Sequence, residues 1–250
     1  LCADDLPGVA PMAVRTEGLS YRFPNEQKYA LRDISVNVPA GSSVAVVGPS
    51  GSGKSTLMAA IAGLFDKIEG QISYEEIPLN NWDLESLRHM IGDNLIQEDL
   101  FQGSLLDNLT LGRNIEFQKV QNAVRVVMLT SWIESLSHGY DTELQPLGKL
   151  LSRAVMRKIL LARAIIHDPR LLLLEDFGRL KIKEWGEDIP RYLTAKERPW
   201  TMIVSTNDPD MVMHCDTIWY MEQGRIVDVC TWEEAKTRTW FKEEFPHTPC

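Results

Sequence analysis

Hydrophobic and polar residues follow two periods along the chain, and each period predicts regular structure. From Leu31 to Val38 apolar and polar residues largely alternate, which is the pattern of a half-buried β-strand. Residues Ser43–Val47 and Leu171–Leu174 are short, nearly continuous apolar runs, which favour strands buried on both faces. Further strands are predicted at Val14–Phe23, Ile68–Tyr74 and Thr201–Ser205, and as a hairpin at 217–221 and 225–229.

The middle of the chain instead shows the period of helices. Phe117–Leu129 places its apolar side chains on one stripe, and Arg153–Ile166 is a second long helix that Pro169 stops. Asp83 is predicted to cap a short helix from Leu84 to Met90, and Thr231 a final helix from 232 to 239. From 83 to about 164 the chain is expected to be mostly helical.

This alternation of strands and helices predicts the fold class and its divisions. Strands that alternate with helices favour a mainly parallel sheet covered by helices, so the chain is expected to be an α/β protein. Residues 1–11 contain two prolines and a glycine and are expected to be a linker. Residues 12–250 are expected to form one domain, with a core at 12–82 and 167–240 and a helical insertion at about 83–166.

Composition narrows the functional class only slightly. The 250 residues are 44% hydrophobic and 24% charged, as in an ordinary soluble globular protein, and the net charge of −9 argues against nucleic acid as a partner. The four cysteines are far apart, which indicates reduced thiols in a cytosolic compartment. No membrane span or signal peptide is visible. Because the chain starts at Leu1, we expect it to be a domain excised from a longer protein.

One glycine-rich stretch carries the clearest chemistry. Residues Gly48–Thr56 read Gly-Pro-Ser-Gly-Ser-Gly-Lys-Ser-Thr and match the P-loop pattern G-x-x-x-x-G-K-[ST]. An apolar strand precedes the match and a run of helix formers follows it, as the motif requires. A simple Gly/Ser turn is the alternative, and these flanks argue against it.

Each residue type in this stretch has a physical task. Gly48, Gly51 and Gly53 allow the tight turn that aims backbone N–H groups at phosphate oxygens. Lys54 would reach the β- and γ-phosphates, and Ser55 would ligate a Mg²⁺ ion. The nucleotide-binding set predicted here is Gly48, Ser50, Gly51, Ser52, Gly53, Lys54, Ser55 and Thr56.

Further segments give the chain a resemblance to a known family. In chain order, these segments are residues 100–109, then Leu151-Ser152 followed by residues 157–164, then residues 167–170 immediately before four leucines, and finally Gly224–Val227. In this order they resemble the nucleotide-binding domain of an ABC transporter of the exporter type, from about Met12 to Trp240. The resemblance implies a P-loop NTPase core, an antiparallel N-terminal β part, an inserted helical subdomain, and ATP and Mg²⁺ as cofactors.

The resemblance also implies partners and a location. Two such domains would sandwich ATP between the P-loop of one and the signature segment of the other, where Ser152 would contact the nucleotide. A transmembrane domain would be the other partner, at the cytoplasmic face of the cell membrane. Phe23 falls where the family stacks an aromatic ring on adenine; an ordinary core phenylalanine is the alternative.

Several family motifs are altered here. The signature LSGGQ is replaced by Leu-Ser-Arg-Ala-Val at 151–155. This replacement puts side chains where the glycine backbone of the family signature would approach the γ-phosphate closely. Arg153 could itself supply positive charge to the partner's γ-phosphate; a solvated helix face is the alternative. The D-loop, at 179–182, is not recognisable.

The catalytic positions differ as well. Glu175 stands for the Walker B aspartate that holds Mg²⁺, and Asp176 for the catalytic glutamate. Asp176 retracts its carboxylate by about one C–C bond, a displacement that can cost on the order of 10²-fold in rate. Asn207 aligns with the switch histidine and cannot carry a proton charge. The Q-loop glutamine aligns with Ile96, and Gln97 is adjacent. Either the loop shifts by one residue or the metal–water contact is lost; we expect the shift, with Gln97 as the catalytic and metal-contacting residue.

The sequence therefore predicts an ATPase of the ABC type with weak hydrolysis, which couples nucleotide binding to export. A nucleotide-dependent module without turnover, paired with a competent domain, is the alternative. A soluble ABC-type protein acting on DNA or the ribosome fits poorly with the acidic charge and the exporter-like segment at 100–109.

Overall fold

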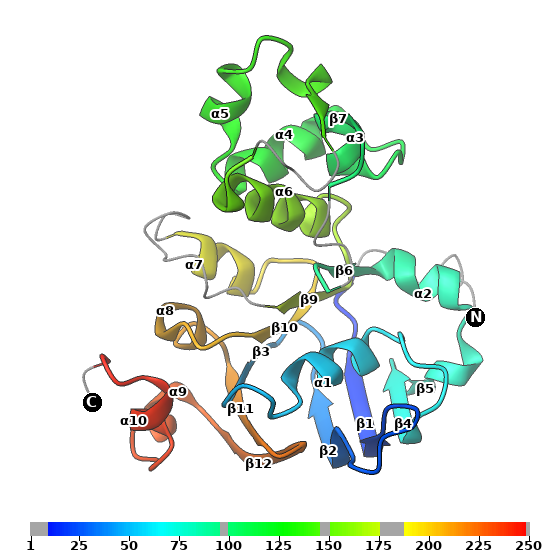
Figure 1. Ribbon diagram of the computed structural model, residues 1–250, viewed down its shortest axis with the longest axis vertical. Coiled ribbons are helices and arrows are strands. Elements are labelled where there is room, and N and C mark those ends of the chain that lie inside the picture. Colours follow the sequence, from blue (N-terminus) through cyan, green and yellow to red (C-terminus); the bar gives the residue numbers. More distant parts are fainter. Residues whose placement is uncertain (1–9, 96–99, 146–150, 176–187, 249–250) are drawn as a thin grey trace.

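The computed structural model describes residues 10–95, 100–145, 151–175 and 188–248 (Figure 1). Its strands are β1 (Val14–Tyr21), β2 (Leu31–Val38), β3 (Ser43–Val47), β4 (Glu69–Tyr74), β5 (Ile77–Pro78), β6 (Ile91–Asp93), β7 (Gly103–Ser104), β8 (Glu143–Leu144), β9 (Leu171–Glu175), β10 (Thr201–Ser205), β11 (Thr217–Glu222) and β12 (Arg225–Cys230). Its α-helices are α1 (Lys54–Ile61), α2 (Leu84–Met90), α3 (Leu105–Thr110), α4 (Phe117–Val126), α5 (Thr130–Glu134), α6 (Arg153–Ile165), α7 (Asp188–Thr194), α8 (Pro209–Val212), α9 (Trp232–Ala235) and α10 (Phe241–Glu244). Short 3₁₀ turns lie at Leu79–Asn81 and Gly139–Asp141.

The main sheet has six strands in the order β12-β11-β3-β10-β9-β6. All neighbours in it are parallel except β11 and β12, which form the predicted antiparallel hairpin. A second sheet, in the order β2-β1-β4-β5, is antiparallel throughout. The fold is therefore the expected α/β class, with a mainly parallel core sheet and an antiparallel N-terminal part.

The period of two in the core strands separates the interior into two apolar clusters. Val44 and Val46 of β3 face a cluster that includes α1 and the antiparallel sheet, so α1 is packed between the two sheets. Ala45 and Val47 face the other cluster, which is formed with α6, α7 and the C-terminal helices. Helices α3 to α6 project beyond the core sheet at the top of Figure 1.

Local sequence signals placed several element boundaries correctly. Asp83 caps α2, and its carboxylate accepts from the Ser86 amide at 2.8 Å. Thr231 forms a capping box with Glu234, although α9 is shorter than predicted and a further short helix, α10, follows it. The expectation of mostly helical structure from 83 to 164 missed β6, which pairs with β9 in the core sheet. Three residues are too few to show a period of two.

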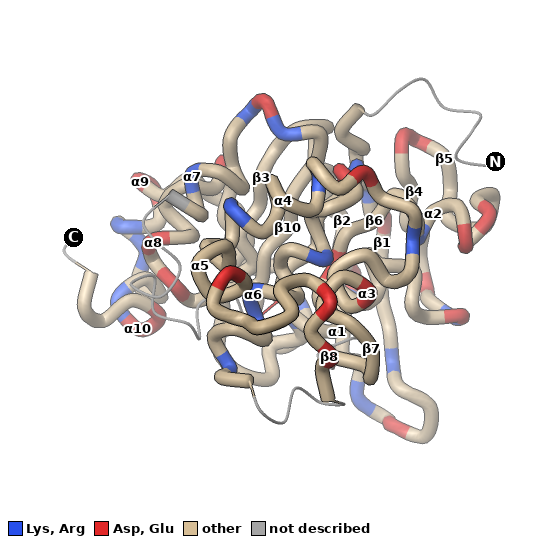
Figure 2. Tube along the Cα trace, turned by 90° about the horizontal axis from the view of Figure 1, so that it is seen from above, with Lys and Arg blue, Asp and Glu red and all other residues tan. Residues whose placement is uncertain are grey.

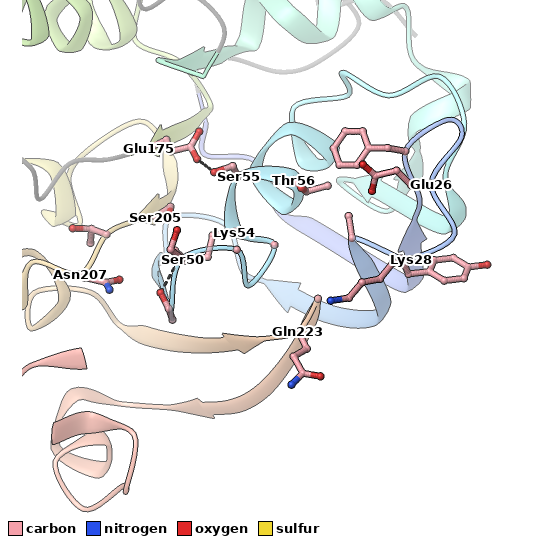
Figure 3. Close-up of a pocket in the computed structure, with 18 residues that line it drawn as sticks. Glu26, Lys28, Ser50, Lys54, Ser55, Thr56, Glu175, Ser205, Asn207 and Gln223 are labelled. Atoms are coloured by element: carbon pink, nitrogen blue, oxygen red, sulfur yellow. Dashed lines mark hydrogen bonds between the residues drawn. The ribbon is translucent and has the colours of Figure 1, made fainter. Parts of the chain in front are cut away.

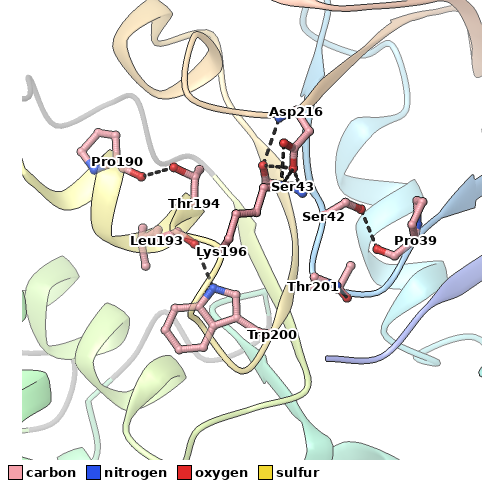
Figure 4. Close-up of polar contacts among 11 residues, drawn as sticks. Pro39, Ser42, Ser43, Pro190, Leu193, Thr194, Lys196, Trp200, Thr201 and Asp216 are labelled. Atoms are coloured by element: carbon pink, nitrogen blue, oxygen red, sulfur yellow. Dashed lines mark hydrogen bonds and ion pairs between the residues drawn. The ribbon is translucent and has the colours of Figure 1, made fainter. Parts of the chain in front are cut away.

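A polar cluster joins the segments at the edge of the sheet where β3 and β11 begin (Figure 4). The Asp216 carboxylate accepts from the backbone N–H and the hydroxyl of Ser43 at 2.8 and 2.9 Å. It also accepts from the Lys196 ammonium at 2.6 Å. Burial by itself would raise the pKa of Asp216, but these hydrogen bonds outweigh it and hold the pKa below its usual value.

Candidate nucleotide-binding site

The glycines of the loop between β3 and α1 are required by its geometry. Gly48 has a φ of 146° and Gly53, which caps α1, has a φ of 104°. A Cβ on Gly48 would lie 2.2 Å from the Met221 carbonyl oxygen, and one on Gly53 would lie 2.7 Å from that of Ala30. Both positions therefore need a residue without a side chain.

The turn of the β11–β12 hairpin holds this loop in place. The Gly224 N–H donates to the Ser52 carbonyl at 2.8 Å, and the Gly224 carbonyl accepts from the Arg32 N–H at 2.8 Å. Ser52 is buried. Since a backbone hydrogen bond from the distant hairpin holds the loop at Ser52, the loop is preorganised before any ligand binds.

The side chains at the start of α1 face a cavity of about 650 Å³, a volume typical of small-molecule sites (Figure 3). Lys54 donates from Nζ to the Gly48 and Pro49 carbonyls at 2.5 and 2.9 Å, so its charge lies against the loop. The Ser55 hydroxyl donates to the Glu175 carboxylate. Hydroxyl and carboxylate oxygens are the ligands that Mg²⁺ prefers, so this pair fits a metal ion bound with phosphates.

One end of the cavity is aromatic. Phe23 is 38% exposed and lies edge-on to two other rings. Its ring centroid is 5.1 Å from that of Tyr21 and 6.0 Å from that of Phe65. It lines the cavity together with Glu26 and Lys28. An exposed face on a braced phenyl ring suits the stacking of a planar base, and it disfavours the alternative of an ordinary core phenylalanine.

The opposite end of the cavity is polar. Glu175, Ser205 and Asn207 line it at the carboxyl ends of β9 and β10. Figure 3 places Asn207 and Glu175 away from Glu26 and Lys28. A nucleotide with its base at the aromatic end and its phosphates on the loop would direct its terminal phosphate toward this polar end.

Comparison with known proteins agrees with this geometry. The family model described as ABC transporter matches residues 31–177. The chain belongs to the ABC transporter family. An ATP-dependent lipid A-core flippase of Chromohalobacter salexigens is 31% identical over 86% of this chain. An ABC multidrug transporter of Cryptococcus neoformans is 30% identical over 88% of it.

A solved structure shows the same relationship in three dimensions. The structure of a bacterial Atm1-family ABC exporter with ATP bound superposes with a TM-score of 0.87 at 25% identity, over 96% of this chain. The chain spans 44% of that exporter, 37% of the flippase and 16% of the multidrug transporter. Its resemblance to exporter-type ABC proteins is thus confirmed. In the described ranges no helix is both long and apolar enough to cross a bilayer.

The ABC signature segment lies apart from this cavity. Ser152 caps α6, and its hydroxyl accepts from the Val155 amide at 3.2 Å. Ala154 and Val155 pack against the apolar cluster of the helical part, whereas Arg153 is exposed. None of the four lines the P-loop cavity, so the predicted contact between Ser152 and nucleotide is not made at the cavity of the same chain.

Two of the predicted ABC catalytic residues lie outside the described residues: Gln97 and Asp176. Ile96 and the D-loop at 179–182 lie outside them as well. The predicted residues that do line the cavity are Phe23, Gly48, Ser50, Gly51, Gly53, Lys54, Ser55, Thr56, Glu175 and Asn207. Ser52 is buried beneath the loop instead, and its side chain braces the turn near Lys54.

Asn94 is a residue of this ABC domain that sequence reasoning missed. Its carboxamide oxygen accepts from the Glu175 N–H at 2.7 Å, and its NH₂ donates to the Glu175 carbonyl at 2.9 Å. This two-point contact fixes the end of β9 and therefore the direction of the Glu175 side chain. The signal was hidden because Asn94 directly follows β6, a strand too short to predict.

Proposed function

We propose that this chain binds Mg²⁺-ATP in the P-loop cavity and acts as the ATP-binding domain of a membrane exporter, with weak hydrolysis. The observation that carries the proposal is the preorganised loop, whose glycines leave room for phosphates beside Lys54 and the Ser55–Glu175 pair. The exporter role is supported by the relatives, which include an ATP-dependent lipid A-core flippase.

Binding follows from the groups that line the cavity. Phe23 would stack on the base, and the backbone N–H groups of 48–56 would surround the phosphates at the start of α1. Lys54 would exchange its loop carbonyls for phosphate oxygens. Ser55 and Glu175, with Gln97, would hold Mg²⁺, which when bound neutralises phosphate charge.

Hydrolysis would depend on Asp176 orienting the attacking water, with Gln97 and Asn207 at the terminal phosphate. A shorter carboxylate at 176 and an uncharged switch residue at 207 both favour a slow rate. The altered signature at 151–155 would weaken the contact that closes two domains around ATP. We therefore expect turnover well below that of an ABC domain with intact motifs.

The partners proposed are a second nucleotide-binding domain and the transmembrane domain of the exporter, at the cytoplasmic face of the membrane. The second domain is either another copy of this chain or a different nucleotide-binding domain, and Ser152 of this chain would face the ATP bound by that domain. A binding module without turnover, beside a competent partner, is the second candidate; the altered residues Asp176, Asn207 and 153–155 favour it.

Steady-state Mg²⁺-ATP hydrolysis at high protein concentration tests these functions. Wild type would be compared with Lys54→Ala, which removes the phosphate contact, and with Asp176→Glu, which restores the longer carboxylate. Wild-type activity above Lys54→Ala, raised further by Asp176→Glu, supports a weak ATPase. ATP binding with no activity in any variant supports the binding module. Equal ATP affinity of wild type and Lys54→Ala would contradict both.

A further inference from the structure

The C-terminal helix α10 places a carboxylate against the polar end of the P-loop cavity. The Asn207 carboxamide donates from Nδ2 to Oε2 of Glu244 at 2.7 Å. Asn207 lines the cavity, and Glu244 is half-buried behind it. Helix α10 lies beside β11 at the lower left of Figure 1, far along the sequence from the P-loop. None of the sequence motifs described above includes Glu244.

The helix that carries Glu244 is firmly anchored. The Trp240 ring stacks on Tyr220 with centroids 4.5 Å apart and planes 4° apart, and its Nε1–H donates to Asp228 at 3.0 Å. Phe241 and Phe245 are almost fully buried, at 0% and 3% exposure. Because aromatic packing fixes α10 on both sides of residue 244, Glu244 is presented from a rigid support.

The charge of Glu244 acts on the P-loop lysine. Burial, with a smaller contribution from the Glu243 carboxylate, raises the pKa of Glu244 above its usual value, while the Lys54 ammonium and the Asn207 hydrogen bond act in the opposite direction. Lys54 is the cation that the P-loop offers to phosphates. Glu244 and a bound terminal phosphate would therefore compete for the Asn207 carboxamide, and both would be attracted by the charge of Lys54.

We propose that Glu244 is a specificity-determining residue that disfavours a nucleoside triphosphate relative to a diphosphate in this cavity. Its carboxylate holds the Asn207 carboxamide and adds negative charge at the end where a γ-phosphate lies. A diphosphate ends earlier in the cavity and avoids most of this repulsion. Discrimination by an unfavourable contact is a common route to specificity. The inference rests on the proposed binding of ATP.

The test measures equilibrium affinities of the 250-residue chain for Mg²⁺-ATP and Mg²⁺-ADP by calorimetry. Glu244→Gln removes the charge but keeps an oxygen that accepts from Asn207. We expect it to tighten ATP binding about fivefold, which is about 1 kcal/mol, and ADP binding by less than about twofold. Glu243→Gln is the matched control, because Glu243 is the exposed neighbour of Glu244 and this substitution removes the same charge.

Other results would overturn the proposal. Equal changes in ATP and ADP affinity for Glu244→Gln, or a result equal to that of Glu243→Gln, would show that Glu244 does not discriminate. Glu244→Ala, which also lacks the charge, should shift the affinity ratio in the same direction; an opposite shift contradicts the proposal.

The two proposals can fail separately. If wild type binds neither nucleotide better than Lys54→Ala does, the proposed function fails and this inference fails with it. If wild type binds both nucleotides and Lys54→Ala binds them weakly, but substitution of Glu244 leaves the ratio of ATP to ADP affinity unchanged, only the inference fails.

Discussion

The Ser55 hydroxyl and the Glu175 carboxylate are hydrogen-bonded across the cavity, joining the first turn of α1 to the end of β9. Two oxygen groups from separate elements thus meet at one point beside the phosphate loop. Asn94 fixes the backbone of Glu175 from the side, so the pair is supported by a third residue. The position of the Ser55–Glu175 pair beside the phosphate loop favours a role for the pair in holding Mg²⁺.

Replacement of Glu175 by Gln should selectively remove the magnesium dependence of ATP binding. A carboxamide oxygen is a weaker Mg²⁺ ligand than a carboxylate, so ATP affinity with Mg²⁺ should fall by about tenfold or more. Affinity measured with a chelator should stay near that of wild type. Glu143→Gln, at an exposed site on β8, is the control. Equal losses with and without Mg²⁺ would contradict the metal role.

Replacement of Gly224 by Ala should destabilise the protein through a steric clash at the hairpin turn. Gly224 has a φ of 80°, and a Cβ there would lie 2.6 Å from the Ala30 carbonyl oxygen. Gly112 has a φ of 69° but nothing within 4 Å, so Gly112→Ala carries only the backbone strain. Urea unfolding should show Gly224→Ala less stable than Gly112→Ala by about 2 kcal/mol. Similar values for both would refute the role of the close contact.

Replacement of Asp216 by Asn should lower stability at neutral pH by about 1–2 kcal/mol, because charge-assisted hydrogen bonds to Ser43 are lost. The pKa of Asp216 is lower in the folded state, so its contribution is complete above the unfolded value of about 3.9. It is lost as the pH falls through the folded pKa. Unfolding curves of the two proteins should therefore converge in acid.

The matched control is Lys196→Met, since the Lys196 side chain is 63% exposed. An exposed ion pair contributes less than about 1 kcal/mol, so this variant should remain closer to wild type. A larger loss for Lys196→Met than for Asp216→Asn would contradict the assignment.

Reversal of charge at Arg153 should weaken ATP-dependent dimerisation. Arg153 is exposed at the start of α6, next to Ser152, where it would face the partner's γ-phosphate. Sedimentation with Mg²⁺-ATP should show association at least about tenfold weaker for Arg153→Glu. Arg125→Glu, exposed on α4, controls for net charge. Unchanged dimer formation and hydrolysis would leave Arg153 as part of a solvated helix face.

Features encoded by neighbouring residues were predictable from the sequence. The P-loop, the strand at Leu171–Leu174, the Asp83 cap and the hairpin around Gly224 all depend on short-range patterns, and the structure confirms each. The roles of Gln97 and Asp176 stay predictions.

Features that depend on tertiary contact were not predictable. Asn94 reaches Glu175 across 81 residues, and Asn207 reaches Glu244 across 37. No local period or spacing marks such pairs, because the partners are brought together by sheet order and by the packing of α10. Asn94 and Glu244, the partners that the sequence analysis missed, look like ordinary polar positions until the fold is known.

The central place of β3 determines what a usable fragment of this protein must contain. Its two neighbours in the sheet, β10 and β11, both follow residue 200 in the chain. A shortened version limited to 31–177, the stretch that matches the family, would leave the buried strand before the P-loop with both hydrogen-bonding edges uncovered. Uncovered apolar edges pair between molecules, so such a fragment should aggregate before any question of nucleotide binding arises.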